Sequence, residues 1–276
     1  MRLGYNTNGL AHHDLSQAIR LLAEIGYESV AITIDHGALD PLGKNWRDQV
    51  MQVKAALDGF GMRSVVETGA RYLLDPNVKH EPTLVSSNAG ARNRRIEFYK
   101  HAIEVACLLR SDCVSLWSGI VRDGADDATA WSRLVEGLQE VCQHATEQGV
   151  TIGFEPEPGM FIDTMAKYQE LLDRLGDSCL QLTLDIGHLH CQGETPLADQ
   201  IRHWGPRIVN VHLEDMRAGV HEHLMFGEGE IDFPPVLAAL REANYQGGIH
   251  VELSRHSHDG PAVAQAAWSF LQKGPR

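Results

Sequence analysis

The feature that most limits the fold of this 276-residue chain is a regular alternation of short β-prone runs and longer amphipathic segments. Helical patterns separate the β-prone runs, and many of them end in Gly or Asn, which is typical of helix C-caps. Eight runs are predicted to be strands, at 3–6, 29–34, 63–67, 113–117, 151–155, 180–185, 208–212 and 248–252. The alternation predicts an α/β fold with parallel strands.

Eight strand–helix units are the number that closes a (β/α)8 TIM barrel, and the length suits one such domain over residues 1–276. A doubly wound open sheet is the alternative. The first strand is followed by no glycine-rich phosphate loop, which disfavours that alternative. For the same reason we expect no nucleotide cofactor.

The composition disfavours several classes of partner. The formal net charge is −13 at pH 7, whereas nucleic acid and anionic membrane surfaces are bound through clustered cations. We therefore expect neither nucleic acid nor a membrane as a partner. The sequence shows no signal-peptide pattern and no apolar stretch long enough to span a bilayer. The five cysteines are scattered without a CxxC pair, which favours a cytoplasmic protein over a disulfide framework.

Strand periodicity places polar side chains on one face of four successive strands, at their carboxyl ends. Side chains alternate between the two faces of a strand. The leucines of 180–185 therefore face outward, toward the helices, and by the same count Val209 and Val211 also face outward. The inward residues at the strand ends are Glu155, Asp185, His212 and Glu252.

Three carboxylates and an imidazole that converge where barrel active sites lie would be unstable together without a cation. One divalent metal removes the repulsion. The mixed ligand set suits Mn²⁺, Mg²⁺, Co²⁺ or Zn²⁺ and does not choose among them. Each residue alone is explained equally well by a cap or a salt bridge, so the set of four is what predicts a metal site.

The motifs around these residues resemble those of the xylose-isomerase-like TIM barrels. That superfamily contains sugar isomerases and epimerases, inosose dehydratase and endonuclease IV. The resemblance covers essentially the whole chain and rests on GFEPEPG with Glu155, LTLDIGH with Asp185 and His188, VNVHLED with His212, FGEGEIDF at 226–233, and HVELS with Glu252.

The resemblance implies roles for individual residues. Glu155, Asp185, His212 and Glu252 would hold the metal, and the two glutamates would also be the catalytic pair that moves a proton α to a carbonyl, through a cis-enediolate. His188 would contact a substrate oxygen or the metal. Arg217 is similar to a substrate-binding arginine of the family. The partner would be a small sugar or polyol, and members often form homo-oligomers.

A later loop, AGVHEHLMFG, opens the alternative of a second metal. The matching loop of endonuclease IV supplies ligands for an additional zinc, so His221 and His223, together with His188, are candidates for a second metal site. Histidines that contact only substrate or solvent are the other interpretation. Trp117 stands where a DNA-repair member has a histidine ligand, which disfavours a multi-zinc endonuclease.

Three further features concern the substrate. Residues 68–95 are too long for a routine connection and are expected to form a lid or specificity loop over the barrel mouth. Glu67 ends the strand before this segment, and by the two-residue alternation its side chain faces inward. We therefore expect Glu67 to line the pocket and bind substrate. Trp117, with Phe161 and Tyr72, is expected to form an apolar wall against a sugar ring.

The sequence therefore favours a divalent-metal-dependent sugar or keto-polyol isomerase or epimerase of carbohydrate metabolism. A metal-dependent dehydratase or lyase acting on a cyclic polyol is the alternative, because the same enolate chemistry can expel a β-hydroxyl. A multi-metal phosphodiesterase and a non-catalytic binding barrel are further alternatives. The sequence does not specify the substrate, the metal or the oligomeric state.

Overall fold

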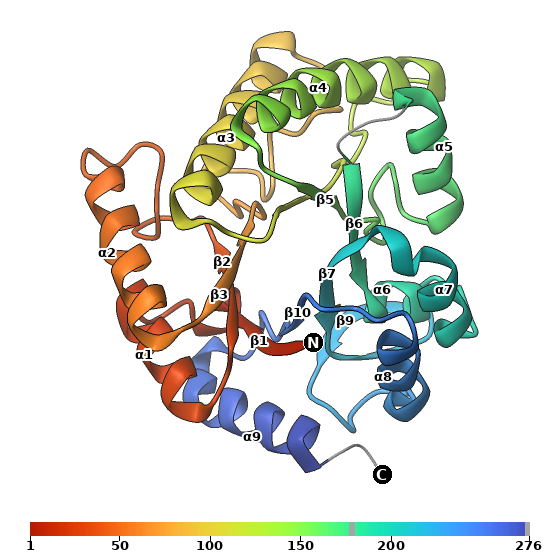
Figure 1. The fold of residues 1–276 in the computed structure, drawn as a ribbon. Helices are drawn as coiled ribbons and strands as arrows, with labels where there is room; N and C mark the ends of the chain where they lie inside the picture. The colour runs from red at the N-terminus through yellow and green to blue at the C-terminus, as the bar shows by residue number, and fades with distance from the viewer. Residues whose placement is uncertain (177–179, 274–276) are drawn as a thin grey trace.

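Within residues 1–176 and 180–273, which the computed structural model describes, eight parallel strands close into a barrel (Figure 1). β1 pairs with both β2 and β10, which closes the ring. The predicted (β/α)8 TIM barrel is therefore confirmed. The barrel strands are β1 (Arg2–Asn6), β2 (Ser29–Thr33), β3 (Arg63–Glu67), β4 (Val114–Leu116), β5 (Ile152–Phe154), β6 (Leu180–Asp185), β7 (Ile208–Leu213) and β10 (Gly248–Val251).

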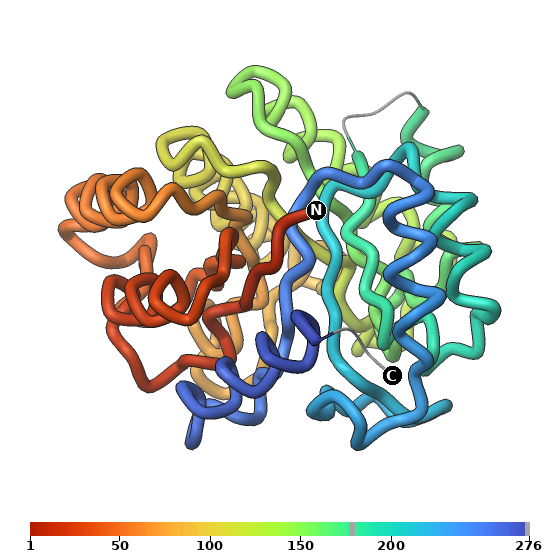
Figure 2. The backbone as a smooth tube through the Cα atoms, turned by 60° about the horizontal axis from the view of Figure 1, so that its bottom comes forward, coloured from red at the N-terminus to blue at the C-terminus, as the bar shows by residue number. Residues whose placement is uncertain are grey.

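Helices surround the barrel (Figure 1). Several begin at a residue whose side chain accepts a hydrogen bond from the first turn, such as Asp14, Asp126 and Thr164. α9 lies beside α1, so the first and the last of these helices are neighbours on the outside of the barrel (Figures 1 and 2). The helices are α1 (Leu15–Ile25), α2 (Trp46–Phe60), α3 (Ala89–Leu109), α4 (Asp127–Gln148), α5 (Met165–Leu175), α6 (Ile186–Cys191), α7 (Leu197–Trp204), α8 (Phe233–Glu242) and α9 (Gly260–Lys273).

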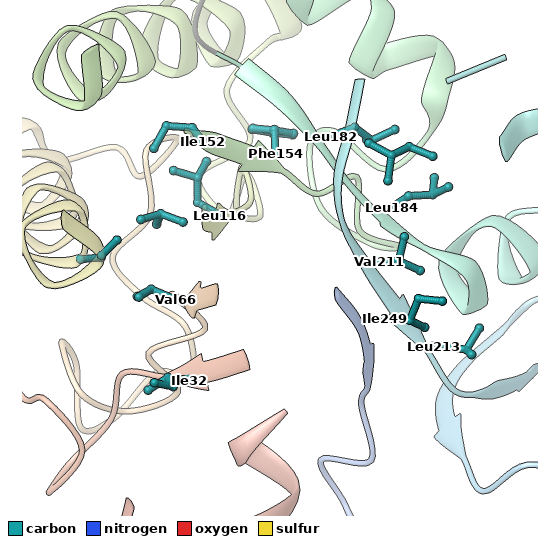
Figure 3. Close-up of a cluster of buried hydrophobic side chains, with 14 of the residues drawn as sticks. Ile32, Val66, Leu116, Ile152, Phe154, Leu182, Leu184, Val211, Leu213 and Ile249 are labelled. Atoms are coloured by element: carbon teal, nitrogen blue, oxygen red, sulfur yellow. The ribbon is translucent and has the colours of Figure 1, made fainter. Parts of the chain in front are cut away.

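An apolar layer between the strands and the helices stabilises this arrangement. Burying each of its side chains stabilises the fold by about 1.5–3 kcal/mol. The alternation predicted for 151–155 and 180–185 is confirmed, because the apolar side chains of β5 and β6 belong to this layer. The strand residues labelled in Figure 3 are Ile32, Val66, Leu116, Ile152, Phe154, Leu182, Leu184, Val211, Leu213 and Ile249, all of them buried.

One strand departs from simple alternation. Leu182 of β6 pairs with Ile208, but the next residue, Thr183, pairs with Asn210, so Val209 is an extra residue in β7. A Cβ on Gly153 would point toward the barrel interior. This Cβ would lie 3.3 Å from the Val209 side chain. The outward orientation predicted for Val209 is therefore wrong, because the register shift places two successive residues on one face.

A short antiparallel hairpin follows β7, in a region where the sequence predicted only a loop. It consists of β8 (Asp215–Arg217) and β9 (Val220–Leu224). The buried carboxylate of Asp215 accepts hydrogen bonds from the backbone N–H groups of Gly227, at 2.8 Å, and Ile231, at 3.1 Å. Asp215 therefore ties the hairpin to the segment after it, where the FGEGEIDF motif lies.

The predicted lid segment 68–95 is shorter than expected, because α3 already begins at Ala89. Arg95, whose side chain is fully buried, anchors the remaining loop. Its guanidinium donates hydrogen bonds to the carbonyl oxygens of Thr68, His80 and Pro82 at 3.2, 2.6 and 2.6 Å. Arg95 of α3 thus holds this loop in place through three carbonyl groups.

Replacing Arg95 with Leu should lower the free energy of unfolding by about 3–5 kcal/mol, because three buried carbonyl groups lose a charged donor. Urea denaturation measures this loss. The neighbouring Arg94 is exposed and donates one hydrogen bond to Leu74, so Arg94→Leu is the matched control, with an expected change within about 0.5 kcal/mol. Equal effects of the two substitutions would contradict the anchoring role of Arg95.

Among the residues that the structure describes, no helix combines the length and the apolar character needed to cross a membrane. The thiols of Cys107, Cys113 and Cys191 are free.

Candidate active site

Four side chains meet at the carboxyl ends of the barrel strands. Glu155 directly follows β5, Asp185 ends β6, His212 lies near the end of β7, and Glu252 directly follows β10. Asp185 and His212 are paired in the strand register, which places them side by side. Each of the four residues offers a ligand-type atom within 4.8 Å of the others. The structure thus brings together all four residues that the sequence nominated as metal ligands.

His212 is the centre of this group. Its Nδ1 lies 3.0 Å from Glu155 Oε1, 3.0 Å from Glu252 Oε2 and 3.8 Å from Asp185 Oδ2. Burial opposes a charged imidazole, but the surrounding carboxylates raise the pKa of His212 well above its ordinary value. The three carboxylates around Nδ1 therefore favour a positive charge at this point of the barrel.

The two glutamates differ in their electrostatic surroundings. Burial raises the pKa of Glu155 to about 8. Burial acts in the same direction on Glu252, but the positive charge of His212 outweighs it and lowers the pKa of Glu252. Glu252 also accepts a hydrogen bond at 2.7 Å from the side-chain amide of Asn8. A carboxyl group with a raised pKa beside one with a lowered pKa is an arrangement that suits acid–base chemistry.

The donor set fits a divalent metal. Asp185 Oδ1 accepts a hydrogen bond from the backbone N–H of His188 at 2.7 Å, whereas the buried Oδ2 has no hydrogen-bond partner among the described residues. A buried carboxylate oxygen is costly unless something binds it. Three carboxylates and one imidazole nitrogen are ligands that Mn²⁺, Co²⁺ and Zn²⁺ accept.

A second layer of contacts orients His212. On the side of the ring away from the carboxylate group, Nε2 lies 2.9 Å from Glu67 Oε1, which also accepts a hydrogen bond from Asn210 at 3.1 Å. Asn210 in turn accepts from His250 at 2.8 Å, and His250 lies 2.9 Å from the hydroxyl of Ser29. Glu67 lines the cavity as expected, but its closest contact assigns it a positioning role at His212.

Glu67→Gln should weaken metal binding by about 10–100-fold, the usual effect of losing a carboxylate behind a histidine ligand. Titration of the chelator-treated protein with Mn²⁺ measures the dissociation constant. Glu28→Gln, at an exposed position, is the control and should leave the affinity unchanged. An unaltered dissociation constant in Glu67→Gln would rule out the positioning role.

A cavity of about 330 Å³ opens above these residues, a volume typical of small-molecule sites. One wall comes from the loop after β3, through Arg71, Lys79 and His80. Trp117 forms part of the apolar wall. Its ring packs edge-on against the His80 ring, with 5.4 Å between the ring centroids. Phe161 instead packs on Trp131, at 5.0 Å between ring centroids. The Tyr72 side chain is exposed.

The remaining predicted residues divide into two groups. His188, His221 and His223 line the cavity. Burial lowers the pKa of His188 to about 3, so its imidazole is neutral. The structure does not bring Arg217 to the cavity, because Arg217 is exposed at the end of β8 and donates a hydrogen bond to the carbonyl oxygen of Glu228 at 3.0 Å.

Two carboxyl groups were missed by sequence reasoning. Glu157 lines the cavity two residues after Glu155. Glu214 is fully buried two residues after His212. Continuing the two-residue alternation beyond each strand end would have identified both, because Glu157 and Glu214 share the inward parity of Glu155 and His212.

The family model of the xylose isomerase-like TIM barrels matches residues 19–274. The chain belongs to this family. An inosose dehydratase of Clostridium beijerinckii is 32% identical over 151 residues, which are 49% of this chain and 49% of that protein. An L-ribulose-5-phosphate 3-epimerase of Salmonella typhi is 24% identical over 253 residues, covering 91% of this chain and 86% of that protein.

The fold is shared with solved structures. The apo form of a 3-keto-D-glucoside 4-epimerase from E. coli superposes with a TM-score of 0.80 at 16% identity, covering 99% of this chain and all of that one (100%). At this level of identity the likeness shows the fold alone. The family membership and the shared fold agree with the resemblance drawn from the motifs.

Proposed function

We propose that this protein is a divalent-metal-dependent isomerase or epimerase that acts on a sugar or keto-polyol. The observation that carries the proposal is the pair Glu155 and Glu252, whose carboxylates both lie 3.0 Å from one nitrogen of His212 inside the cavity. Two carboxyl groups that flank one reacting carbon can remove a proton on one face and return it on the other. The sugar epimerase among the relatives supports this reading.

In this proposal Glu155, Asp185, His212 and Glu252 hold the metal. When bound, the metal would supply polarisation of the substrate carbonyl. Asn8 holds the Glu252 carboxylate in position through its 2.7 Å hydrogen bond. Glu252, the more acidic group, takes the proton α to the carbonyl, and Glu155 delivers one.

Substrate recognition is assigned to the rim of the same cavity. His188 is a neutral hydrogen-bonding group for a substrate hydroxyl, and Trp117 excludes water from a sugar ring face. Arg71 and Lys79 offer donors to hydroxyl groups or to an anionic substituent. Arg71 is held in place by a hydrogen bond to the backbone carbonyl of Asn8 at 3.1 Å. These contacts suit a small polyhydroxylated ketone.

A dehydratase acting on a cyclic polyol is the second candidate, because an inosose dehydratase is 32% identical to this chain over 49% of its length. The two candidates share the first proton abstraction and differ in whether water leaves afterwards. Proton NMR in D₂O of metal-loaded protein with a panel of ketopentoses, ketohexoses, their phosphates and ketocyclitols separates them. The proposal predicts an epimer or aldose that carries one deuterium and has lost no water. Loss of a hydroxyl group from the product would establish the dehydratase instead.

A further inference from the structure

Glu214 is a buried carboxylate that the proposed reaction does not use. Its side chain is fully inaccessible to solvent, and neither Oε1 nor Oε2 has a hydrogen-bond partner among the described residues. Glu214 directly follows β7, and it alternates with Asn210 and His212 along the chain, so its side chain faces the barrel interior as theirs do. A buried carboxylate with both oxygens unpartnered costs several kcal/mol unless a cation or a donor reaches it.

Two other unpartnered groups lie beside it. Asp185 Oδ2 and His223 Nδ1 are buried without a hydrogen-bond partner among residues 1–176 and 180–273. His223 Nδ1 lies 3.8 Å from Glu214 Oε2, which makes an ion pair when the imidazole is protonated but is too long for a hydrogen bond. Asp185, Glu214 and His223 each offer a ligand-type atom, and these atoms all lie within 4.8 Å of one another. Three buried groups that lack a hydrogen bond are thus clustered together.

The local sequence leaves room for this arrangement. A Cβ on Gly187 would overlap Glu214 Oε1 and would lie 2.7 Å from the Met216 Cε atom. Gly187, which follows Asp185 by two residues in the DIGH motif, is therefore the residue that lets the Glu214 carboxylate approach α6 (Ile186–Cys191).

The neighbouring imidazoles of His188 and His221 already have hydrogen-bond partners. His188 Nδ1 lies 3.2 Å from the carbonyl oxygen of Pro156, so Nδ1 carries the proton and Nε2 is left as an acceptor. His221 Nε2 lies 3.1 Å from that acceptor and can donate to it. His188 and His221 therefore satisfy each other, whereas Asp185 Oδ2, both Glu214 oxygens and His223 Nδ1 have no hydrogen-bond partner among the described residues.

We propose that Asp185, Glu214 and His223 form a second divalent-cation site, which adjoins the first because Asp185 belongs to both ligand sets. Two carboxylates and one imidazole suit Mn²⁺, Fe²⁺, Co²⁺ or Zn²⁺. The β8–β9 hairpin contributes His223, so the ion would also fasten this hairpin to the barrel. The second site does not depend on the reaction proposed above.

Titration of chelator-treated protein with Co²⁺ tests the site, with the stoichiometry measured by calorimetry and the ligand field by visible absorption. We expect two Co²⁺ per chain in the wild type and one in Glu214→Gln. Glu228→Gln, an exposed change on the same segment, should retain two. His221→Ala should also retain two, because His221 lies outside the proposed ligand set.

A single Co²⁺ in the wild type, or two in Glu214→Gln, would overturn the second site. Loss of one Co²⁺ in His221→Ala but not in Glu214→Gln would assign the second ion to the imidazoles and would also overturn it. If Glu214→Gln does not fold, His223→Gln decides by the same count. If the wild type binds one ion and His212→Ala loses it, the second site is wrong but the proposed function stands. If the wild type binds two ions but exchanges no proton on any ketose, the second site stands but the proposed function is wrong.

Discussion

Replacing Glu155 or Glu252 with Gln should lower turnover by about 10²–10⁴-fold, the usual contribution of a positioned acid or base. Gln keeps the shape and one oxygen of the side chain but neither accepts nor releases the proton. Both carboxylates contact His212 in the same cavity, so either change removes one half of the proposed transfer. Steady-state rates measured on the epimer or aldose found by NMR check the prediction.

The two variants should differ from each other in isotope exchange. In Glu252→Gln, deuterium should still enter the substrate epimer whose proton faces Glu155, but the other epimer should not form. Glu155→Gln should show the opposite selectivity. Glu28→Gln, which changes an exposed carboxylate, should behave as wild type. Full turnover in either active-site variant would remove that glutamate from the proton transfer.

His212→Ala should abolish metal binding at the first site, with an affinity loss of more than about 100-fold. Loss of an outer contact such as Glu67 is expected to cost about 10–100-fold, and His212 is the imidazole that all three carboxylates surround. Metal content after equilibrium dialysis against Mn²⁺ measures the effect.

The control for this change is His12→Ala, at an exposed position outside the cavity, which should bind as wild type. Circular dichroism verifies that His212→Ala is folded. Retention of wild-type affinity in the folded variant would show that His212 is not a ligand.

Much of the barrel and its ligand set could be predicted because one rule governs both. In β5 and β6 the two-residue alternation sends Ile152, Phe154 and Leu184 to the helices and Asp185 to the interior. Parallel strands then bring their carboxyl ends to one face of the barrel. The convergence of the four ligand candidates follows from periodicity and topology without any knowledge of loop structure.

Two of the mispredicted features depend on contacts between distant residues. The register shift at Val209 is set by pairing with β6, and the hairpin after β7 is held by hydrogen bonds from Gly227 and Ile231 to Asp215. Arg217 has no periodic signal that distinguishes a surface position from a cavity position. The start of α3 at Ala89 was missed because its first residues, AGARNRR, are polar and lack an apolar stripe.

In the proposed reaction Glu155 and Glu252 move a proton on a ketose carbon beside a bound cation. Deuterium incorporation from D₂O into the ketose, followed by mass spectrometry, tests this reaction with chelator-treated protein and with the same protein reloaded with Mn²⁺. We predict that one deuterium enters α to the carbonyl with the reloaded protein and none with the chelated protein. Equal incorporation in both samples, or none in a reloaded sample that holds its metal, would contradict the proposed reaction.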